Sequence, residues 1–245
     1  MTLPWKVVWV TGSSSGIGAE IALQLAKAGV KVAASARHLT DPPPHPNISY
    51  YPLDVTDEKA SATCAIKIEQ QIGPIELAIF GAGAYAAFKP ETFDLKTFAH
   101  INDVNYMGSV KTLNAVLPHF MARKSGHLAF VASVAGYQGL PKAAYYGPTK
   151  AALINLAEAL WIELRPHGIT VSVVNPGFVE TPMTAANDFP MPFLMKPQQA
   201  AALTIAGLKT KRFEIAYPLR FVLILKFLQK LPQALKLRLV ARLTG

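Results

Sequence analysis

The feature that most constrains the fold of this chain is a short apolar run, followed by a glycine-rich turn and a helical pattern, in WKVVWVTGSSSGIGAEIALQLAK. The run from Val7 to Val10 has the length and composition of a buried strand. Ile17, Ile21 and Leu25 recur at helical spacing and are expected to face a sheet. A strand, tight turn and helix in this order predict a phosphate-binding site at the helix N-terminus, where unpaired N–H groups can meet an anion.

Three glycines in this segment have different structural roles. Gly12 permits the tight turn, Gly16 lets the backbone approach a pyrophosphate, and Gly18 allows the helix to pack closely on the strand. Three residues separate Gly12 from Gly16, so the spacing differs from the general GxGxxG dinucleotide fingerprint. The turn therefore indicates a dinucleotide site of a more particular type.

Strand and helix patterns alternate through most of the chain. We expect further strands at 30–34, 48–53, 77–80, 126–132 and 170–174, and helices at 58–71, 93–122 and 144–164. This alternation predicts an α/β fold with a single Rossmann-type, doubly wound parallel sheet that has helices on both faces. Ligands of such sheets bind at the carboxyl ends of the strands, and the candidate site residues cluster just after the predicted strands.

Tyr146 and Lys150, in YYGPTK, and Ser133, in VASVAG, form a proton-transfer set. Residues at i and i+4 share one face of a helix, so the Lys150 ammonium can lie beneath the Tyr146 phenol, whereas Tyr145 lacks this spacing. At ~4 Å and an effective dielectric near 20, the two groups interact by about 4 kcal/mol. We therefore expect Lys150 to lower the pKa of Tyr146 from ~10 towards neutrality. The set predicts chemistry on a carbonyl or an alcohol.

Five motifs in register resemble the short-chain dehydrogenase/reductase family. They are TGSSSGIG, Asn105 in NDVNYMG, Ser133, Tyr146-x-x-x-Lys150, and NPGFVET from Asn175 to Thr181. The resemblance implies that Tyr146 exchanges a proton with the substrate oxygen, that Ser133 donates a hydrogen bond to that oxygen, and that Lys150 tunes Tyr146. It also implies that Asn105 holds a water linking Lys150 to solvent; the alternative is a helix-kink or capping asparagine.

The resemblance also implies a bound nicotinamide dinucleotide. NADP is expected, because Ala36 stands where NAD-preferring members have an aspartate and Arg37 can pair with a 2′-phosphate. The alternatives are that Arg37 is a solvated loop residue and that Asp54 caps a helix. The implied cofactor-binding residues are Gly12, Ser14, Ser15, Gly16, Ile17, Gly18, Arg37, Asp54, Val55, Ala82, Gly83, Tyr146, Lys150, Pro176, Gly177, Val179 and Thr181. We expect no metal ion.

One motif departs from the family pattern. Family members commonly have Asn-Asn-Ala-Gly after the fourth strand, and this chain has Phe80, Gly81, Ala82 and Gly83. The two small residues that allow passage beside the adenosine ribose remain. The two amides that brace the central sheet are absent, so we expect the bracing of the sheet to differ more than the chemistry.

The segment at about 183–197 lies where the family carries its substrate lid, and it is rich in Met, Phe and Pro. Such side chains make adaptable hydrophobic surfaces and favour a lipid-like or steroid-like ketone, aldehyde or secondary alcohol. Ordinary packing of the lid on the body of the protein is the alternative. A second functional class also stays open, a non-catalytic dinucleotide-binding redox sensor or a membrane-recruited scaffold. The intact Ser133, Tyr146, Lys150 and Asn105 favour the enzyme.

Positive charge is concentrated at the C-terminus. Residues 1–208 contain 15 Lys/Arg and 14 Asp/Glu (+1), whereas residues 209–245 contain 9 Lys/Arg and one acid, Glu214 (+8). The stretch 217–243 predicts two short amphipathic helices separated by Pro232, with Leu235, Leu239 and Leu243 on one face of the second. Basic amphipathic helices can lie on an anionic membrane surface. Packing of their apolar faces on the domain or across a subunit interface is the alternative.

These features suggest one domain with two parts. We expect a Rossmann-fold NADP-binding catalytic domain at 1–208 and a basic amphipathic extension of it at 209–245. The resemblance implies a homodimer or homotetramer, and no nucleic-acid module is recognised. The N-terminus has no basic region before a long apolar run, and no stretch is long and uncharged enough to cross a bilayer. We therefore expect a cytoplasmic protein, either free or peripheral on the inner face of a membrane.

Overall fold

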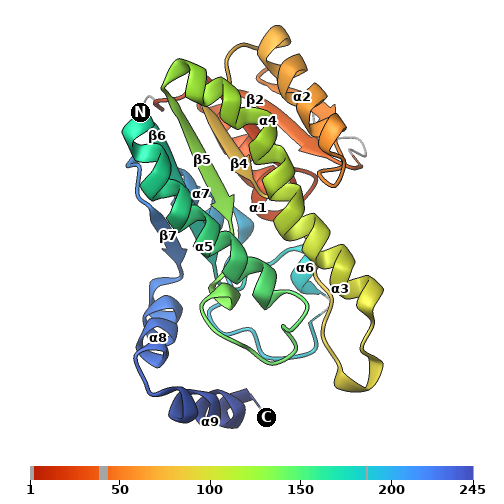
Figure 1. The fold of residues 1–245 in the computed structure, drawn as a ribbon, viewed down its shortest axis with the longest axis vertical. Helices are drawn as coiled ribbons and strands as arrows, with labels where there is room; N and C mark the ends of the chain where they lie inside the picture. The colour runs from red at the N-terminus through yellow and green to blue at the C-terminus, as the bar shows by residue number, and fades with distance from the viewer. Residues whose placement is uncertain (1–2, 39–43, 186, 245) are drawn as a thin grey trace.

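Parallel strands form the centre of the molecule in the computed structural model, which describes residues 3–38, 44–185 and 187–244 (Figure 1). The described strands make one sheet in the order β3-β2-β1-β4-β5-β6-β7, and every neighbouring pair is parallel. The strands are β1 (Val7–Thr11), β2 (Lys31–Ala36), β3 (Ile48–Pro52), β4 (Leu77–Phe80), β5 (Gly126–Val131), β6 (Ile169–Pro176) and β7 (Glu214–Tyr217). The order changes direction between β1 and β4, which places a crevice at the carboxyl ends of those strands. The predicted doubly wound sheet is confirmed.

Helices cover both faces of this sheet. On one face lie α1 (Gly16–Lys27) and α7 (Pro197–Lys209), and on the other lie α2 (Glu58–Gln71), α4 (Gly108–Arg123) and α5 (Gly147–Leu164). Along β1, Val8 and Val10 pack towards α1, and Val7 and Trp9 pack towards the opposite core. Because both faces are covered, β1 is buried at every position, as is typical of a central parallel strand.

The prediction of one continuous helix over 93–122 is wrong. The segment is divided into α3 (Leu95–Asn102), a π-helical turn (Asp103–Met107) and α4. Asp94 fixes the start of α3, because its carboxylate accepts hydrogen bonds from the first-turn N–H groups. The π turn adds a residue to the helical turn and is frequent at functional sites. It contains Asn105, whose side chain is fully buried.

Helix α5 begins later than the predicted residue 144. Its first residue is Gly147, and Tyr146 stands at the N-cap position with Pro148 in the first turn. Proline is favoured there because its missing N–H would have no helical partner. The phenol of Tyr146 therefore projects from the very start of α5, at the carboxyl edge of the sheet.

The C-terminal extension begins with a strand that the sequence analysis missed. β7 joins the edge of the main sheet beside β6, and α8 (Leu219–Gln229) and α9 (Gln233–Thr244) follow it. Figure 1 shows these two helices at the end of the molecule opposite to the N-terminus. Their apolar residues Val222, Leu225, Leu228 and Val240 form a third core cluster with Val134. The side chain of Leu243 lies outside the described residues.

Within the described ranges, no helix combines the length and the apolar character needed to cross a membrane.

Candidate active site

The glycine-rich turn after β1 is shaped by close backbone packing. Gly12 has φ +70, and a Cβ there would lie 2.4 Å from the Gly81 carbonyl oxygen. A Cβ on Gly18 would lie 2.3 Å from the Gly12 oxygen. No side chain fits at either contact, so the turn depends on glycine. The N-cap Ser15 makes no side-chain cap, and the first turn of α1 has no acidic residue, which suits the N-terminus of α1 to an anion.

A cavity of about 210 Å³ opens between this turn and the carboxyl ends of the central strands. Small side chains and exposed backbone line its inner end, and Tyr146 and Lys150 close the other. Of the predicted cofactor residues, those that line it are Gly12, Ser14, Ser15, Gly16, Ile17, Gly18, Gly83, Tyr146, Lys150, Pro176, Gly177, Val179 and Thr181. Arg37, Asp54, Val55 and Ala82 are not among its lining residues. The glycine cradle fits the pyrophosphate of a dinucleotide.

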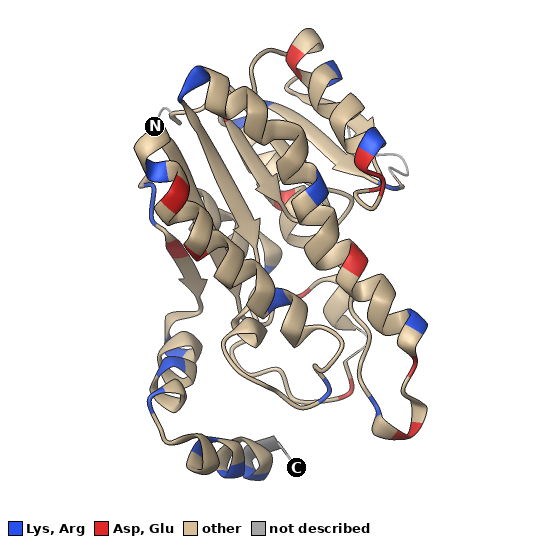
Figure 2. Cartoon of the chain, viewed as in Figure 1, with Lys and Arg blue, Asp and Glu red and all other residues tan. Residues whose placement is uncertain are grey.

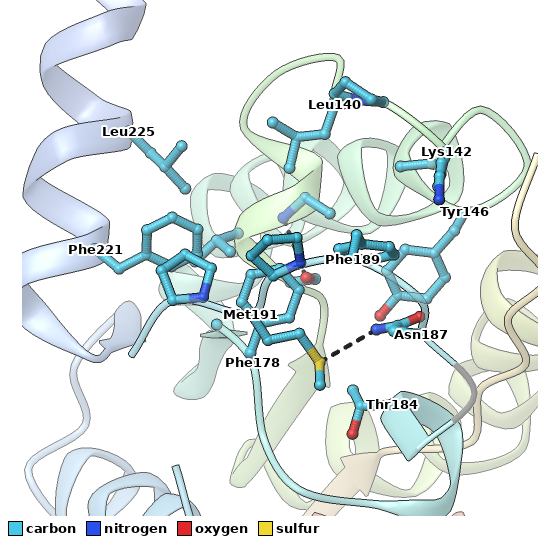
Figure 3. Close-up of a pocket in the computed structure, with 18 of the residues that line it drawn as sticks. Leu140, Lys142, Tyr146, Phe178, Thr184, Asn187, Phe189, Met191, Phe221 and Leu225 are labelled. Carbon is cyan, nitrogen blue, oxygen red and sulfur yellow. Dashed lines mark hydrogen bonds between the residues drawn. The ribbon is translucent and has the colours of Figure 1, made fainter. Parts of the chain in front are cut away.

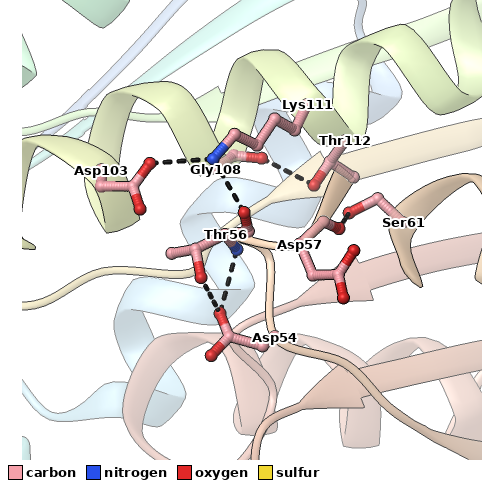
Figure 4. Close-up of polar contacts among 8 residues, drawn as sticks. All are labelled: Asp54, Thr56, Asp57, Ser61, Asp103, Gly108, Lys111 and Thr112. Atoms are coloured by element: carbon pink, nitrogen blue, oxygen red, sulfur yellow. Dashed lines mark hydrogen bonds and ion pairs between the residues drawn. The ribbon is translucent and has the colours of Figure 1, made fainter. Parts of the chain in front are cut away.

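Asp54 belongs to a separate polar cluster after β3 (Figure 4). Its carboxylate accepts hydrogen bonds from both the N–H and the hydroxyl of Thr56, at 2.9 Å and 2.8 Å. The expected alternative, that Asp54 caps a helix, is wrong, because Asp57 caps α2. Burial alone would raise the pKa of Asp54, but the Thr56 hydrogen bonds and the positive charge of Arg37 hold it below its usual range. Arg37 and Asp54 are therefore electrostatic neighbours.

Val55 and Ala82 are held by backbone packing near this cluster. A Cβ on Gly108 of α4 would lie 2.6 Å from a Val55 methyl carbon, so α4 can approach the segment after β3 only because residue 108 is glycine. Ala82 lies beside the turn, since a Cβ on Gly12 would also lie 2.6 Å from the Ala82 nitrogen. Val55 therefore packs against the start of α4, and Ala82 lies beside Gly12 of the glycine-rich turn.

The proton-transfer residues Ser133, Tyr146 and Lys150 lie together at this cavity. Lys150 is buried, donates a hydrogen bond of 2.9 Å to the Val131 carbonyl, and places its ammonium 5.3 Å from the centre of the Tyr146 ring. The Ser133 hydroxyl accepts a hydrogen bond from the Ala135 N–H, which fixes its orientation. The rival phenol of Tyr145 is used elsewhere, because it accepts a 2.7 Å hydrogen bond from the Asp94 N–H.

The expected fall in the pKa of Tyr146 is wrong for this structure. Burial raises the pKa of Tyr146 to about 12, the Ser133 hydrogen bond opposes that rise, and nearby Tyr85 adds to it. Burial also lowers the pKa of Lys150 to about 8. Desolvation disfavours the charged form of each group, and it is the largest influence on both pKa values. Tyr146 is therefore a protonated phenol at neutral pH.

Asn105 braces the loop that follows β4. Its amide oxygen accepts a 2.7 Å hydrogen bond from the Ala84 N–H, and its amide nitrogen donates to the Ala84 carbonyl and to the Thr149 hydroxyl. A Cβ on Gly83 would lie 3.6 Å from this amide oxygen and 3.8 Å from the Lys150 ammonium. Asn105 thus lies close to Lys150, in the π turn, and its side chain forms hydrogen bonds with Ala84 and Thr149.

Other groups connect the central strands at the place where family members commonly have the two amides. The Thr11 hydroxyl accepts a 3.1 Å hydrogen bond from the Gly81 N–H and contacts the Ile79 carbonyl. Phe80 is buried against Phe130, with ring centroids 4.8 Å apart. A threonine hydroxyl and an aromatic pair therefore connect β1, β4 and β5 in this protein.

A second and larger cavity, of about 580 Å³, lies beyond Tyr146 (Figure 3). It is bounded by the loop after β5, the segment after β6 and the two C-terminal helices. Its lining is predominantly apolar and includes Leu140, Phe178, Phe189, Met191, Phe221 and Leu225. Its polar lining residues are Tyr85, Ser133, Gln138, Lys142, Tyr146, Thr184 and Asn187. Both amide atoms of Gln138 are buried without a hydrogen-bond partner among the described residues. The cavity therefore suits a largely apolar molecule that carries a few polar groups.

The predicted lid forms one wall of this larger cavity. Its base is closed by a bridge between Val179 and Met195, with hydrogen bonds from Glu180 N–H to Met195 and from Met195 N–H to Phe178. The short helix α6 (Pro182–Ala185) lies at the start of the lid. An ion pair of 2.5 Å between Lys142 and Asp188 joins the lid to the loop after β5. Lid residues line the cavity and also pack on the body, as the edge-to-face contact of the lid residue Phe189 with Phe178 illustrates.

Ser133 and Tyr146 line both cavities, together with Gly177, Met183 and Thr184. Sequence reasoning missed Tyr85, whose ring meets that of Tyr146 edge to face at 5.5 Å. It also missed the tail residues Phe221 and Leu225, whose only sequence signal is their helical spacing. The hydrogen bond from Lys150 to the Val131 carbonyl could not be predicted from the sequence, because every residue has a backbone carbonyl group.

A glycine-rich dinucleotide cradle joined to a tyrosine and a buried lysine on a doubly wound sheet defines a dinucleotide-dependent oxidoreductase. The chain belongs to the short chain dehydrogenase family, whose sequence model matches residues 6–189. It is 34% identical over 241 residues to an uncharacterized oxidoreductase of Myxococcus xanthus, covering 95% of each chain. An uncharacterized oxidoreductase of Staphylococcus saprophyticus is 31% identical over 83% of this chain and 91% of the relative.

A solved structure extends the similarity to the fold. A short-chain dehydrogenase from Streptomyces avermitilis superposes with a TM-score of 0.80 at 25% identity, over 90% of this chain and 91% of that one. The protein is thus an oxidoreductase of a family that binds a nicotinamide dinucleotide.

Proposed function

We propose that this protein is an NADP-dependent oxidoreductase that transfers hydride between NADPH and a hydrophobic ketone, aldehyde or secondary alcohol. The observation that supports this most is the meeting of the two cavities at Ser133 and Tyr146. One cavity has the glycine cradle of a dinucleotide, and the other is apolar. A group at their junction contacts both bound molecules.

Tyr146 is the proton donor in this proposal. When bound, the dinucleotide supplies hydride to the carbonyl carbon in reduction, or accepts it from the alcohol in oxidation. Tyr146, whose pKa is raised to about 12, gives its proton to the carbonyl oxygen as that oxygen gains negative charge. The Ser133 hydroxyl is oriented by the Ala135 N–H and can donate to the same oxygen. Lys150 then returns a proton to Tyr146.

The preference for NADP rests on the residue that follows β2. Ala36 offers no carboxylate to a ribose hydroxyl, and the exposed Arg37 carries a guanidinium that can bind a phosphate in a bidentate manner. Asp54 and Val55, beside Arg37, would meet the adenine end. The glycine turn and the N-terminus of α1 would hold the pyrophosphate.

The apolar cavity favours a long or bulky substrate. At about 580 Å³ it is within the range of sites for small organic ligands, and rings from Phe178, Phe189 and Phe221 form much of its wall. A sugar has hydroxyl groups on all sides, and this wall offers hydrogen-bonding partners such as Gln138 and Asn187 to only a few of them. A lipid-like or steroid-like carbonyl compound would bury its chain there and present its oxygen to Tyr146.

The proposal is tested by NADPH consumption with a chain-length series of aliphatic aldehydes and ketones, with NADH in parallel. Tyr146→Phe removes the proton donor and keeps the ring, so turnover should fall by about 10²- to 10⁴-fold while NADPH still binds. Tyr145→Phe is the matched control, because Tyr145 lines neither cavity. Tight NADPH binding by the wild type with no turnover of any substrate would instead support the redox sensor.

A further inference from the structure

The outward side of α8 carries an apolar stripe. Leu219, Leu223 and Phe227 recur at i, i+4 and i+8, and they are 66%, 58% and 65% exposed. The inward side of the same helix holds Val222, Leu225 and Leu228, which are buried in the third core cluster. Both sides of α8 are therefore apolar, and only one of them is covered by the protein. We call the three exposed residues the α8 stripe.

The inward side of α8 is fixed by polar contacts. Lys226 forms an ion pair with Glu214 of β7, and Glu214 also accepts a 2.6 Å hydrogen bond from the Tyr137 hydroxyl. Gln229 donates a 2.6 Å hydrogen bond to the Tyr137 carbonyl. These contacts tie α8 to the loop that contains Ser133. The direction of the α8 stripe is therefore set by the body of the protein.

The charge around the α8 stripe is entirely positive. Arg220 and Lys230 are exposed at the two ends of α8, and Arg238 and Arg242 are exposed on α9. No Asp or Glu follows Glu214 in the sequence, and Glu214 is already paired with Lys226. Figure 2 shows Lys and Arg but no Asp or Glu on these two helices. Among the described ion pairs, none involves Arg220, Lys230, Arg238 or Arg242.

The apolar surface continues from the α8 stripe into the substrate cavity. Ile224, next to the stripe, is 49% exposed and also lines the cavity. Leu225 and Leu228 of α8 and Val240 of α9 line the cavity as well. The same pair of helices therefore offers apolar side chains to the outside of the molecule and forms a wall of the cavity inside.

We propose that α8 and α9 dock on an anionic lipid bilayer. The α8 stripe inserts at the boundary between head groups and acyl chains, and the flanking arginine and lysine side chains meet the anionic head groups. This orientation places the Ile224 side of the cavity against the membrane. A lipid-like substrate would then enter from the bilayer without crossing water, a consequence that rests on the proposed function. The docking itself does not depend on the proposed function.

Flotation with lipid vesicles, in the absence of cofactor and substrate, tests the docking. We expect the full-length protein to float with vesicles of phosphatidylcholine and phosphatidylglycerol, and to release as salt is raised. Arg220→Gln with Lys230→Gln should lower the partition coefficient by about 25-fold, at about fivefold for each charge. Leu223→Asp should abolish flotation, because it places a carboxylate within the α8 stripe.

Matched controls lie on α2. Lys59→Gln with Lys67→Gln removes two exposed charges, and Ile66→Asp changes an apolar side chain that is 47% exposed. These variants should float like the wild type, and thermal melts should show all variants folded.

Failure of the wild type to float would overturn the docking, as would equal losses in the α2 variants. A dimer that dissociates in Leu223→Asp, with no vesicle binding, would assign the α8 stripe to a second copy. An active enzyme that does not float would overturn the docking and leave the proposed function intact.

Discussion

At the scale of single residues, burial sets the protonation of the catalytic pair. Lys150 is buried and Tyr146 is partly buried, and desolvation lowers the pKa of the lysine to about 8 and raises that of the tyrosine to about 12. Near neutral pH the ammonium and the phenol are both protonated. Both groups can therefore donate a proton, and reduction requires this protonation state.

This protonation predicts opposite pH dependences for the two directions. Reduction needs protonated Lys150 to reprotonate Tyr146, so its kcat should be constant below pH 8 and fall up to tenfold per pH unit above it. Oxidation needs the pair to accept a proton, so its kcat should rise as pH increases through about 8. Steady-state rates in both directions, from pH 6 to pH 10 at saturating substrate, check this. A profile without a change near pH 8 in either direction would contradict the role given to Lys150.

A second prediction at this scale concerns Arg37. Arg37→Ala should weaken NADPH binding by about 10- to 100-fold, because a charge-assisted bidentate contact to phosphate is lost, and should leave NADH binding nearly unchanged. Fluorescence titration of each dinucleotide measures both. Lys31→Ala, an exposed cation at the opposite end of β2, is the matched control. Equal weakening of the two dinucleotides would remove the basis for the NADP preference.

The sequence was a good guide to which residues gather at the site and a poor guide to their electrostatics. Gly12, Ser133, Tyr146 and Lys150 carry motif signals, and the structure brings all of them to the same pair of cavities. The pKa of Tyr146 could not be predicted from its spacing to Lys150. Desolvation depends on the walls that enclose the pair, and those walls come from segments far apart in the chain.

At the scale of elements, the strong periodic patterns were predicted and the exceptions to them were not. The helix at 58–71 and the strand at 77–80 match α2 and β4 at both ends. The π turn around Asn105 was missed because one inserted residue hardly disturbs an apolar pattern. β7 was missed because Glu214–Tyr217 is short and begins with an acidic residue within a basic segment. Its register is set by β6, which only the folded sheet supplies.

The pairing of β5 with β6 makes a prediction about acid stability. His127 is buried between these strands, with Nε2 2.9 Å from the Ser172 hydroxyl, and burial with Lys211 nearby lowers its pKa to about 4. The unfolded value is near 6.5, so the stabilisation is complete above pH 6.5 and is lost as pH falls towards 4. Urea unfolding of the wild type should lose about 2 kcal/mol more between pH 7 and pH 5 than that of His127→Gln. The same loss in both proteins would show that His127 does not titrate on unfolding.

At the scale of the whole molecule, the larger cavity exists only because distant segments meet. The loop after β5, the lid after β6 and the helices of the C-terminal extension each supply a wall. Motif analysis reached the lid through its position after NPGFVET, but it gave the extension no part in the substrate site. The extension closes the cavity because β7 joins the sheet beside β6 and the helix that follows it, α8, supplies Phe221, Ile224 and Leu225 to the lining.

This arrangement predicts that two phenylalanines of α8 act differently on substrate selection. Phe221 lines the cavity and stacks on Phe178 at 5.7 Å between ring centroids, whereas Phe227 is 65% exposed and does not line it. In vesicle-free buffer, Phe221→Ala should raise KM for long-chain carbonyl substrates by about tenfold, because an apolar wall is lost, and should leave short-chain substrates unaffected. Phe227→Ala should leave both unchanged. Steady-state kinetics across the chain-length series decides between these outcomes. A parallel rise in KM for all chain lengths in Phe221→Ala would mean that α8 supports the catalytic loop and does not form a wall of the substrate site.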